Sequence, residues 1–144
     1  MKKFALVFTA LTLCCSVSYA ASIQSLNKEQ VMKTLEDKTI TTVPLVTLHG
    51  DLIPNTVSVY FGKGGELLGQ FTNKPVNDPQ NDQGSWQVKG NGQVCVNWKN
   101  WTSNKPICVY TYKLANSLVF INTDNKFESM VLSDNIQSGN QVHS

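Results

Sequence analysis

Histidine is the side chain best suited to act as a general base at neutral pH, and this chain has only two, His49 and His143. His143 is the penultimate residue of a polar tail, where no packed shell would hold it in position. His49 lies two residues before Asp51 and could pair with it and a serine in a hydrolase. No Gly-x-Ser-x-Gly elbow accompanies this pair, so the sequence favours a turn histidine and predicts no catalytic residue.

The acidic residues give weaker signals for chemistry. Glu66 and Asp51 stand at the ends of expected strands, but no motif pairs them as the two carboxylates of a glycosidase. The loop of residues 77–84 offers oxygen ligands for calcium, yet Gln83 and Lys89 stand where an EF-hand needs Gly and Glu. We therefore expect a solvated turn at this loop, no metal site and no cofactor.

The four cysteines divide into two pairs. Cys14 and Cys15 fall in the N-terminal leader described below, which leaves Cys95 and Cys108 in the rest of the chain. Zinc needs about four ligands, and a redox-active pair favours the Cys-x-x-Cys spacing; the sequence has neither pattern. In an oxidising compartment we expect a disulfide between Cys95 and Cys108, worth on the order of 3 kcal/mol by the loop-entropy estimate.

Residues 1–20 have the pattern of a secretory signal peptide. Two lysines precede an apolar stretch, and the small residues Ser18 and Ala20 fit a cleavage site. The stretch is shorter than the roughly 20 residues of a membrane span, so we expect no transmembrane segment after processing. A lipoprotein is the alternative, but the leucine before Cys14 is too large for that cleavage site. The leader therefore predicts export, to the periplasm or the extracellular medium.

The charge of the processed chain excludes one class of partner. Removing Lys2 and Lys3 with the leader leaves ten basic residues against ten acidic ones. The basic residues are scattered lysines, and the chain contains no arginine. Nucleic-acid binding rests on clustered cations and bidentate arginine contacts, so we expect no nucleic-acid partner.

The hydrophobic pattern predicts one helix followed by short strands, in a single domain over residues 21–132. Asn27 and Gln30 are spaced as a capping box before the apolar stripe of Val31, Met32 and Leu35, and the helix should end near residue 37. We expect strands at residues 39–47, 56–61, 66–71, 85–89, 93–98, 107–113, 117–122 and 127–132.

Turn residues between these runs favour antiparallel hairpins, above all at residues 62–65, 90–92 and 123–126. A meander of about seven or eight strands must close as a small barrel or pack as a sandwich, and the helix could plug one end. We expect Pro44 to leave the first strand at an edge or bulged. Residues 72–84 should form a long polar loop and residues 133–144 a flexible polar tail.

The cysteine pair also predicts a strand register. If Cys95 lies opposite Cys108, Val94 faces Val109 and Val96 faces Ile107 on one side of the hairpin. The disulfide, Tyr110 and Tyr112 then lie on the other side, so both faces of the hairpin are partly apolar.

The loop after residue 98 is the candidate binding segment. Trp101 lies in a polar loop between Lys99 and Lys105, close to Trp98, and we expect its ring at the surface. An exposed tryptophan beside lysines suits a protein, glycan or membrane-interface contact. The alternative is that Trp101 simply packs over the disulfide.

Several of these residues recur together in one family. The shared elements are a Lys-Thr pair after the helix, a Tyr-Phe-x-x-Gly segment, Gly-x-Trp, Cys-x-x-Trp and a second Cys. They stand here at Lys38-Thr39, Tyr60-Phe61 with Gly64, Gly84-Ser85-Trp86, Cys95 to Trp98, and Cys108. On these residues, within about residues 26–113, the chain resembles a family of small exported bacterial proteins known as a domain of unknown function. The resemblance implies a secreted, disulfide-containing, β-rich module and brings no activity with it.

Together these observations favour an exported, non-enzymatic bacterial module that binds a protein, glycan or lipid partner, such as a host or envelope component. Two alternatives remain open. A periplasmic inhibitor of a lysozyme-like enzyme would insert a protruding loop, from residues 99–106 or 72–84. A barrel for a small apolar ligand or lipid would contain a cavity.

Overall fold

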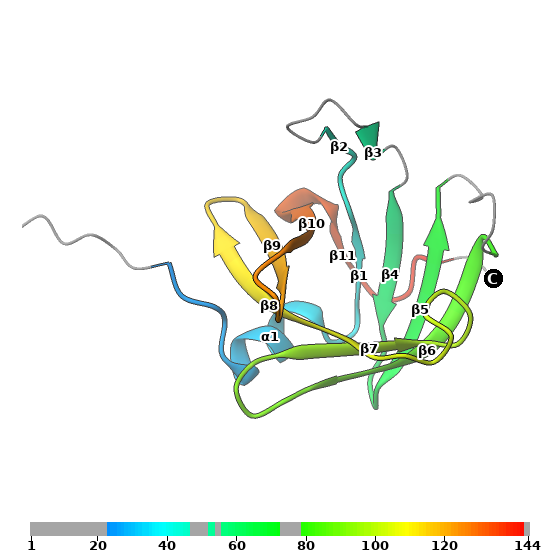
Figure 1. Cartoon of the computed structure of the whole chain (residues 1–144), viewed down its shortest axis with the longest axis horizontal. Coiled ribbons are helices and arrows are strands. Elements are labelled where there is room, and N and C mark those ends of the chain that lie inside the picture. The colour runs from blue at the N-terminus through cyan, green and yellow to red at the C-terminus, as the bar shows by residue number, and fades with distance from the viewer. Residues whose placement is uncertain (1–22, 47–51, 54–55, 73–78, 143–144) are drawn as a thin grey trace, which may run out of the picture.

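The structure is a computed structural model that describes residues 23–46, 52–53, 56–72 and 79–142. The expected signal peptide therefore lies outside the described residues, as do His49, Asp51 and His143. Strands make up most of the fold, with one α-helix and one 3-10 turn (Figure 1). The elements are α1 (Lys28–Leu35), β1 (Lys38–Thr41), β2 (Leu45–Val46), β3 (Leu52–Ile53), β4 (Val57–Phe61), β5 (Glu66–Phe71), β6 (Asn81–Val88), β7 (Val94–Trp98), β8 (Ile107–Leu114), β9 (Ser117–Asn122), β10 (Phe127–Leu132), η1 (Ser133–Asn135) and β11 (Ile136–Ser138).

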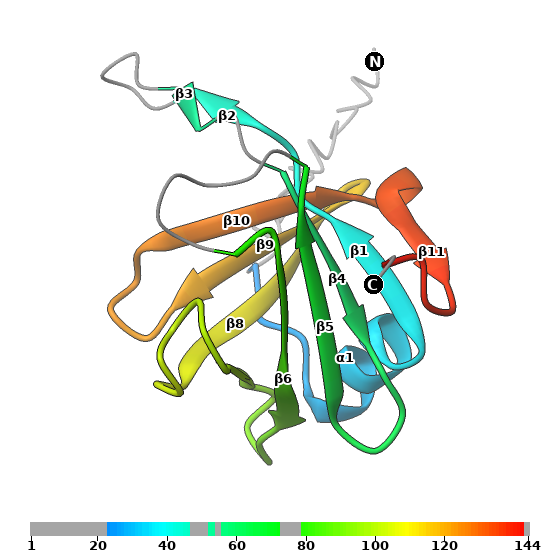
Figure 2. The ribbon, with the colours of Figure 1, turned by 90° about the vertical axis from the view of Figure 1, so that its right-hand side faces the viewer.

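Nine of these strands form one antiparallel sheet in the order β10-β9-β8-β7-β6-β5-β4-β1-β11. The stretch from β4 to β10 is the predicted meander, in which each strand pairs with the next. The sheet curls so that β1 and β10 approach each other. Just beyond β1, the Val43 N–H donates to the Met130 carbonyl at 3.0 Å, an ordinary backbone hydrogen-bond distance. The mainly β prediction is confirmed, and the open choice between barrel and sandwich resolves as a nearly closed barrel, whose strands surround an interior in Figure 2.

The helix begins where the sequence predicts. Asn27 Oδ1 accepts the Gln30 N–H, and Gln30 Oε1 accepts the Asn27 N–H, both at 2.9 Å, which completes the capping box. Val31 and Leu35 are fully buried, and α1 contacts β1 and β6. The helix therefore closes one end of the barrel, as the sequence allowed.

The β7–β8 hairpin has the predicted register. Cys95 lies opposite Cys108, with Val94 opposite Val109 and Val96 opposite Ile107. The two cysteines form a disulfide with their Cα atoms 4.0 Å apart. A disulfide is consistent with an exported protein, since oxidising compartments maintain such bonds.

Glycines permit the tight β4–β5 turn. Gly64 and Gly65 have φ values of +84° and +94°, a region that other residues adopt only with strain. The Gly62 N–H donates to the Glu66 carbonyl across the turn. Residues 62–65 are therefore a hairpin turn, as predicted.

Three boundaries differ from the sequence prediction, and in two of them, the start of β6 and the C-terminal segment, pairing with a distant strand outweighs local composition. The first strand breaks after Thr41, before Pro44, and leaves the separate β2–β3 pair. β6 begins at Asn81 rather than residue 85, because the backbone of residues 81–84 pairs with β5. The predicted flexible tail is wrong for residues 133–142: η1 is followed by β11, which pairs with β1, and Val142 is buried.

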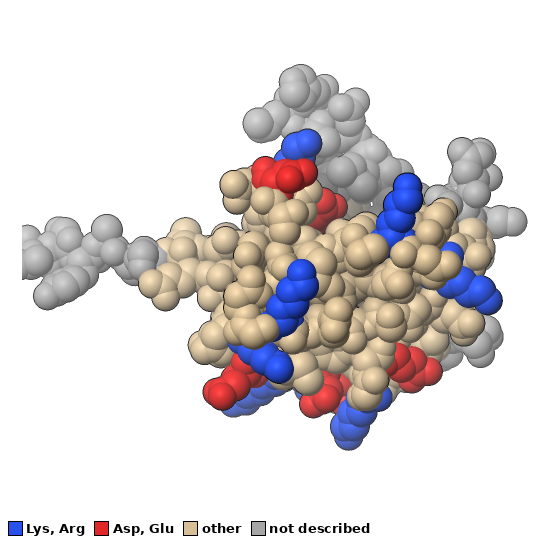
Figure 3. All heavy atoms as spheres, turned by 60° about the horizontal axis from the view of Figure 1, so that its bottom comes forward, with Lys and Arg blue, Asp and Glu red and all other residues tan. Residues whose placement is uncertain are grey.

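No helix among the described residues is both long enough and apolar enough to cross a membrane. On the face shown in Figure 3, lysines and acidic side chains alternate without a large region of one sign. This arrangement matches the scattered charges of the sequence.

Candidate functional site

The barrel interior contains an apolar pocket of about 150 Å³ between β1, β4, β7, β8 and β10, with Phe120 of β9 also in its wall. Nine of its twelve lining residues are apolar. Phe61 and Val94, both buried, lie deep in it, near the end that α1 closes. Ile107 is 39% exposed and lies at the opposite end, so the pocket opens at the end of the barrel away from the helix.

The polar side chains of the pocket lie toward this opening. They are Thr42, just after β1, and Glu128 and Ser129, near the start of β10. The register between β9 and β10 shifts between Phe127 and Ser129, so Glu128 is the extra residue of a β-bulge. Bulges re-aim side chains at the rims of barrels, and this one places the Glu128 carboxylate at the mouth of the pocket.

Asn122 orients the Glu128 carboxylate. The Asn122 amide Nδ2 donates to Glu128 Oε1 at 2.6 Å. The Oδ1 of the same amide accepts the N–H groups of Asp124 and Lys126 in the β9–β10 turn, both at 2.9 Å. The turn therefore holds the amide, and the amide holds one oxygen of the carboxylate.

An aromatic cluster of Phe71, Trp98 and Trp101 lies beside the pocket. The Trp101 ring centroid is 4.6 Å from that of Trp98 and 4.4 Å from that of Phe71. Both tryptophan rings approach Gly69, where an added Cβ would be 2.5 Å from Trp101 Cζ3 and 2.6 Å from Trp98 Cη2. Because Gly69 has no side chain, the loop between β7 and β8 can fold back and pack Trp101 against the sheet.

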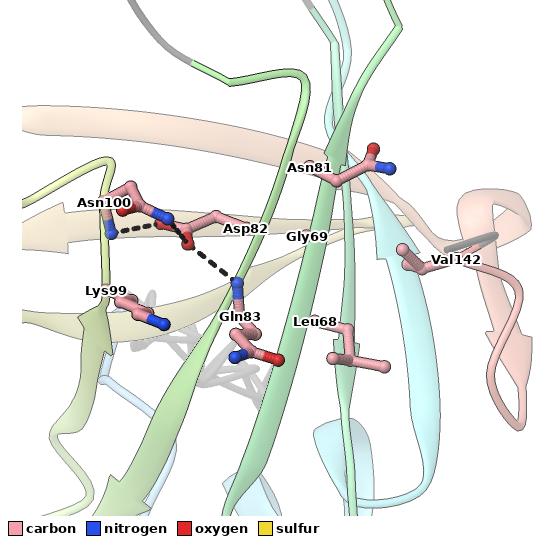
Figure 4. A pocket seen from close by; sticks show the side chains of 8 residues that line it. All are labelled: Leu68, Gly69, Asn81, Asp82, Gln83, Lys99, Asn100 and Val142. Atoms are coloured by element: carbon pink, nitrogen blue, oxygen red, sulfur yellow. Dashed lines mark hydrogen bonds between the residues drawn. The ribbon is translucent and has the colours of Figure 1, made fainter.

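Asp82 fastens this loop. Its Oδ2 accepts the N–H groups of Asn100 and Trp101, both at 2.8 Å, and its Oδ1 accepts Gln83 N–H and Asn100 Nδ2, both at 2.9 Å. Figure 4 shows the bonds to Gln83 and Asn100. Asp82 is only 7% exposed. Burial raises the pKa of its carboxyl group, but the N–H donors of Trp101, Asn100 and Gln83 outweigh burial and hold that pKa below its ordinary value.

A second hollow of about 270 Å³ surrounds this anchor on the outer side of β5 and β6. Leu68, Gln83 and Lys99 line it together with Val142 from the C-terminal segment (Figure 4). Both Asp82 oxygens already accept N–H groups. This hollow therefore has a mixed lining without a free buried polar group to define a ligand.

A third polar cluster lies next to α1 and holds the β4–β5 hairpin. Asp37 accepts the Tyr60 hydroxyl at 3.0 Å and forms an ion pair with Lys63 at 3.1 Å. The hydrogen bonds from Lys63 and Tyr60 lower the pKa of Asp37, and the same contacts raise the pKa values of Lys63 and Tyr60. Each of the three side chains is thus stabilised in the protonation state that it has at neutral pH. The cluster therefore serves the structure of the hairpin.

The predicted binding residues lie in different environments. Lys99 and Lys105 are exposed, as expected. Trp98 is buried and lines the pocket. The prediction that Trp101 stands exposed is wrong: its ring is half-buried, and its Nε1 donates to the Pro79 carbonyl at 2.8 Å. The alternative placed Trp101 over the disulfide, but its ring packs on Trp98 and Phe71.

The acidic residues considered as candidates for chemistry also lie in different environments. Glu66 is exposed at the start of β5, while its possible partner lies outside the described residues. Asp82 of the acidic loop is part of a strand, and its oxygens accept N–H groups, while residues 77 and 78 of that loop lie outside the described residues. Among the described residues no three His, Cys, Asp or Glu side chains gather as metal ligands.

Glu128 and Asp82 were not predicted as residues that organise the site. Asp82 stood in a run of Asn, Asp and Gln that is typical of a loop, and Glu128 stood in a strand whose bulge leaves no mark in the sequence. Asn122, two residues before Asp124, was the one available signal, since an asparagine there can hydrogen-bond the turn backbone.

Together the fold and the site define a small, disulfide-bonded antiparallel β-barrel with a helix at one end and an apolar pocket opening at the other. No protein-family model, curated protein or solved structure matches the chain.

Proposed function

We propose that the chain is an exported, non-enzymatic binding module that takes a small apolar group into the barrel pocket. The observation that carries this proposal is the pocket itself, an apolar space of about 150 Å³ that opens at the mouth marked by Ile107. Apolar cavities of about this size hold a benzene-sized molecule. Ligand sites in small barrels commonly lie at such a mouth.

The leader and the disulfide support the proposed export of the chain. Residues 1–20 have the pattern of a signal peptide, and the Cys95–Cys108 bond suits the periplasm or the extracellular medium. The resemblance to small exported bacterial proteins, carried by residues such as Trp86 and Trp98, supports the same compartment. The partner we expect there is a component of the envelope or of a host that carries an apolar group.

The pocket is favoured over a loop contact as the binding site. Asp82 fastens the β7–β8 loop, and the indole N–H and ring of Trp101 make internal contacts. The loop therefore uses its largest apolar side chain for internal contacts. The pocket, in contrast, has apolar walls and is open at one end.

The test is a titration with 1-hexanol, a neutral probe with a short apolar chain, followed by tryptophan emission because Trp98 lines the pocket. We expect saturable binding by the wild type. Val96→Phe places a larger ring in the pocket and should weaken binding by about tenfold or more, because the ring occupies the ligand's space.

The matched control is Val119→Phe. Val119 lies opposite Tyr112, on the outer side of β9, and does not line the pocket. Thermal unfolding of both variants separates loss of binding from loss of folding. Absence of saturable binding by the wild type, or an equal effect of both substitutions, would contradict the proposal.

A further inference from the structure

The mouth of the barrel pocket contains one charged side chain among its lining residues, the carboxylate of Glu128. The walls below it are hydrocarbon and aromatic, including Val59, Trp98 and Phe120. A ligand that fills the pocket must therefore place an uncharged apolar part inside and any polar part beside Glu128.

The geometry of the bulge makes this carboxylate available. Glu128 is exposed, and Asn122 Nδ2 holds its Oε1. The described residues give its Oε2 no hydrogen-bond partner. A ligand N–H or O–H group at the mouth would therefore meet an oriented acceptor.

Two hydroxyl side chains extend the polar rim. Thr42 Oγ1 accepts the Val57 N–H at 2.9 Å, which leaves the hydroxyl proton to donate. The Ser129 side chain also lines the pocket, next to Glu128. These groups can hydrogen-bond an amine or an alcohol, but they supply no positive charge to balance an acid.

Among the described residues, the other charges at this end of the barrel lie outside the pocket wall. Asp124 and Lys126 stand together in the β9–β10 turn, and Lys105 lies in the β7–β8 loop. All three are exposed, and none lines the pocket. Their charges are screened by water more strongly than a group in direct contact with the ligand.

We infer that the pocket selects ligands with a short apolar body and a cationic or hydroxyl head group, and that it rejects the matching carboxylates. This inference rests on the proposed function, since it names the class of ligand for the same pocket. Its two supports are the apolar walls of limited volume and the single oriented carboxylate at the opening.

The experiment compares three probes with the same chain: 1-hexylamine, 1-hexanol and hexanoate at neutral pH. We expect hexylamine to bind about tenfold more tightly than hexanoate, because an attractive pair with Glu128 replaces a repulsive one at a partly solvated site. Hexanol should lie between them. Added salt should narrow the difference.

Glu128→Gln removes the charge while it keeps the size of the side chain. In this variant hexylamine and hexanoate should bind within about twofold of each other, and hexanol affinity should change less than that of hexylamine, because hexanol has no charge to pair with Glu128. Asp124→Asn is the matched control, because it removes an equal charge from the adjoining turn at a residue outside the pocket wall. It should keep the preference of the wild type, and thermal unfolding checks that both variants fold.

The outcomes separate the two proposals. If none of the three probes binds the wild type, the pocket is not a ligand site and both proposals fail. If the probes bind with equal affinity, or hexanoate binds best, the pocket remains a site and the selection by Glu128 is overturned. Equal loss of selectivity in Asp124→Asn and Glu128→Gln also overturns it, because the effect would then be one of overall charge.

Discussion

Asp82 shows how one buried side chain can determine the course of a loop. Its carboxylate accepts four N–H groups, from Gln83, Asn100 and Trp101, and it lies opposite Gly69 in the β5–β6 register. The anchor therefore acts on the strand pair and the β7–β8 loop at once. Hydrogen bonds to a charged acceptor are stronger than neutral ones, and a buried N–H left without a partner is costly.

We expect Asp82→Ala to lower the free energy of unfolding by about 3 kcal/mol at neutral pH, since it leaves the partly buried N–H groups of Asn100 and Trp101 without an acceptor. Urea unfolding measures the loss. Asp124→Ala, at an exposed turn position, is the control and should change stability by less than about 0.5 kcal/mol. Equal stability of the two variants would contradict the anchoring role.

The same anchor predicts a dependence on pH. The pKa of Asp82 is lower in the folded protein than in the unfolded chain, where an aspartate has a pKa of about 3.9. Its stabilisation is therefore complete above about pH 4 and is lost as the pH falls through the folded value.

Urea unfolding over a pH series should show a difference between wild type and Asp82→Ala that is constant near neutrality and shrinks in acid. Asp37, whose pKa is also lowered, remains in both proteins and cancels in this comparison. A difference that stays constant down to about pH 2 would show that the charge of Asp82 does not supply the stabilisation.

Gly69 makes the complementary prediction about space. An added Cβ would lie 2.5 Å from Trp101 Cζ3, which no side chain tolerates without movement. Gly69→Ala should therefore destabilise the fold by about 1–3 kcal/mol and change tryptophan emission. Gly90→Ala is the matched control, because nothing lies within 4 Å of its added Cβ, and it should be neutral or slightly stabilising. Equal stability of the two variants would mean that Trp101 does not pack on Gly69.

At the scale of elements, some helices and strands are determined by their local sequence pattern and others by pairing with distant strands. The capping box at Asn27 and the strands β5, β9 and β10 carry local signals, and their predicted bounds agree with the structure to within one residue. β11 and the start of β6 carry none, because their polar residues favour loops. They become strands only because β1 and β5 offer free backbone groups to pair with.

The site divides in the same way. Val94, Val96, Ile107 and Val109 were predicted on one apolar face, and that face is a wall of the pocket. The polar mouth of the pocket could not be predicted from the sequence, because the placement of Glu128 depends on a register shift between two strands. A bulge changes which side chain faces inward without changing the alternation of residue types nearby.

The disulfide tests how far the β7–β8 hairpin depends on covalent support. Replacement of both Cys95 and Cys108 by alanine should lower the free energy of unfolding by about 3 kcal/mol, since the bond closes a short loop in the unfolded chain. The valine pairs on the inner face should keep the register, so far-UV circular dichroism should be unchanged. Chemical reduction of the wild type should give the same loss. A loss below about 1 kcal/mol would mean that the hairpin is held by its packing alone.

At the scale of the whole molecule, the barrel must protect its two edges. The approach of β1 and β10 is made by few contacts, chiefly the bond from Val43 N–H to the Met130 carbonyl. β1 pairs with β4 on one side and with β11 on the other, so that Thr39 is only 2% exposed although its strand lies near the end of the sheet. The C-terminal segment therefore completes a fold whose other strands follow one another along the chain.

Removal of this segment predicts a change in association as well as in stability. A chain that ends at Asn135 loses β11 and the contacts of Gly139, whose N–H donates to the Asp37 carbonyl and whose own carbonyl accepts the Thr39 hydroxyl. The backbone of β1 would then be open along one side, and open strands pair with other chains. We expect lower stability, by about 2–4 kcal/mol, and concentration-dependent self-association.

Sedimentation and urea unfolding would measure both effects. A chain that ends at Asn140 is the matched control, because it keeps β11 and Gly139 while it loses Val142. The control should remain monomeric if the wild type is, since the edge of β1 stays covered. If the shorter chain neither associates nor loses stability, then β1 does not need β11, and the closure between β1 and β10 must protect the sheet by itself.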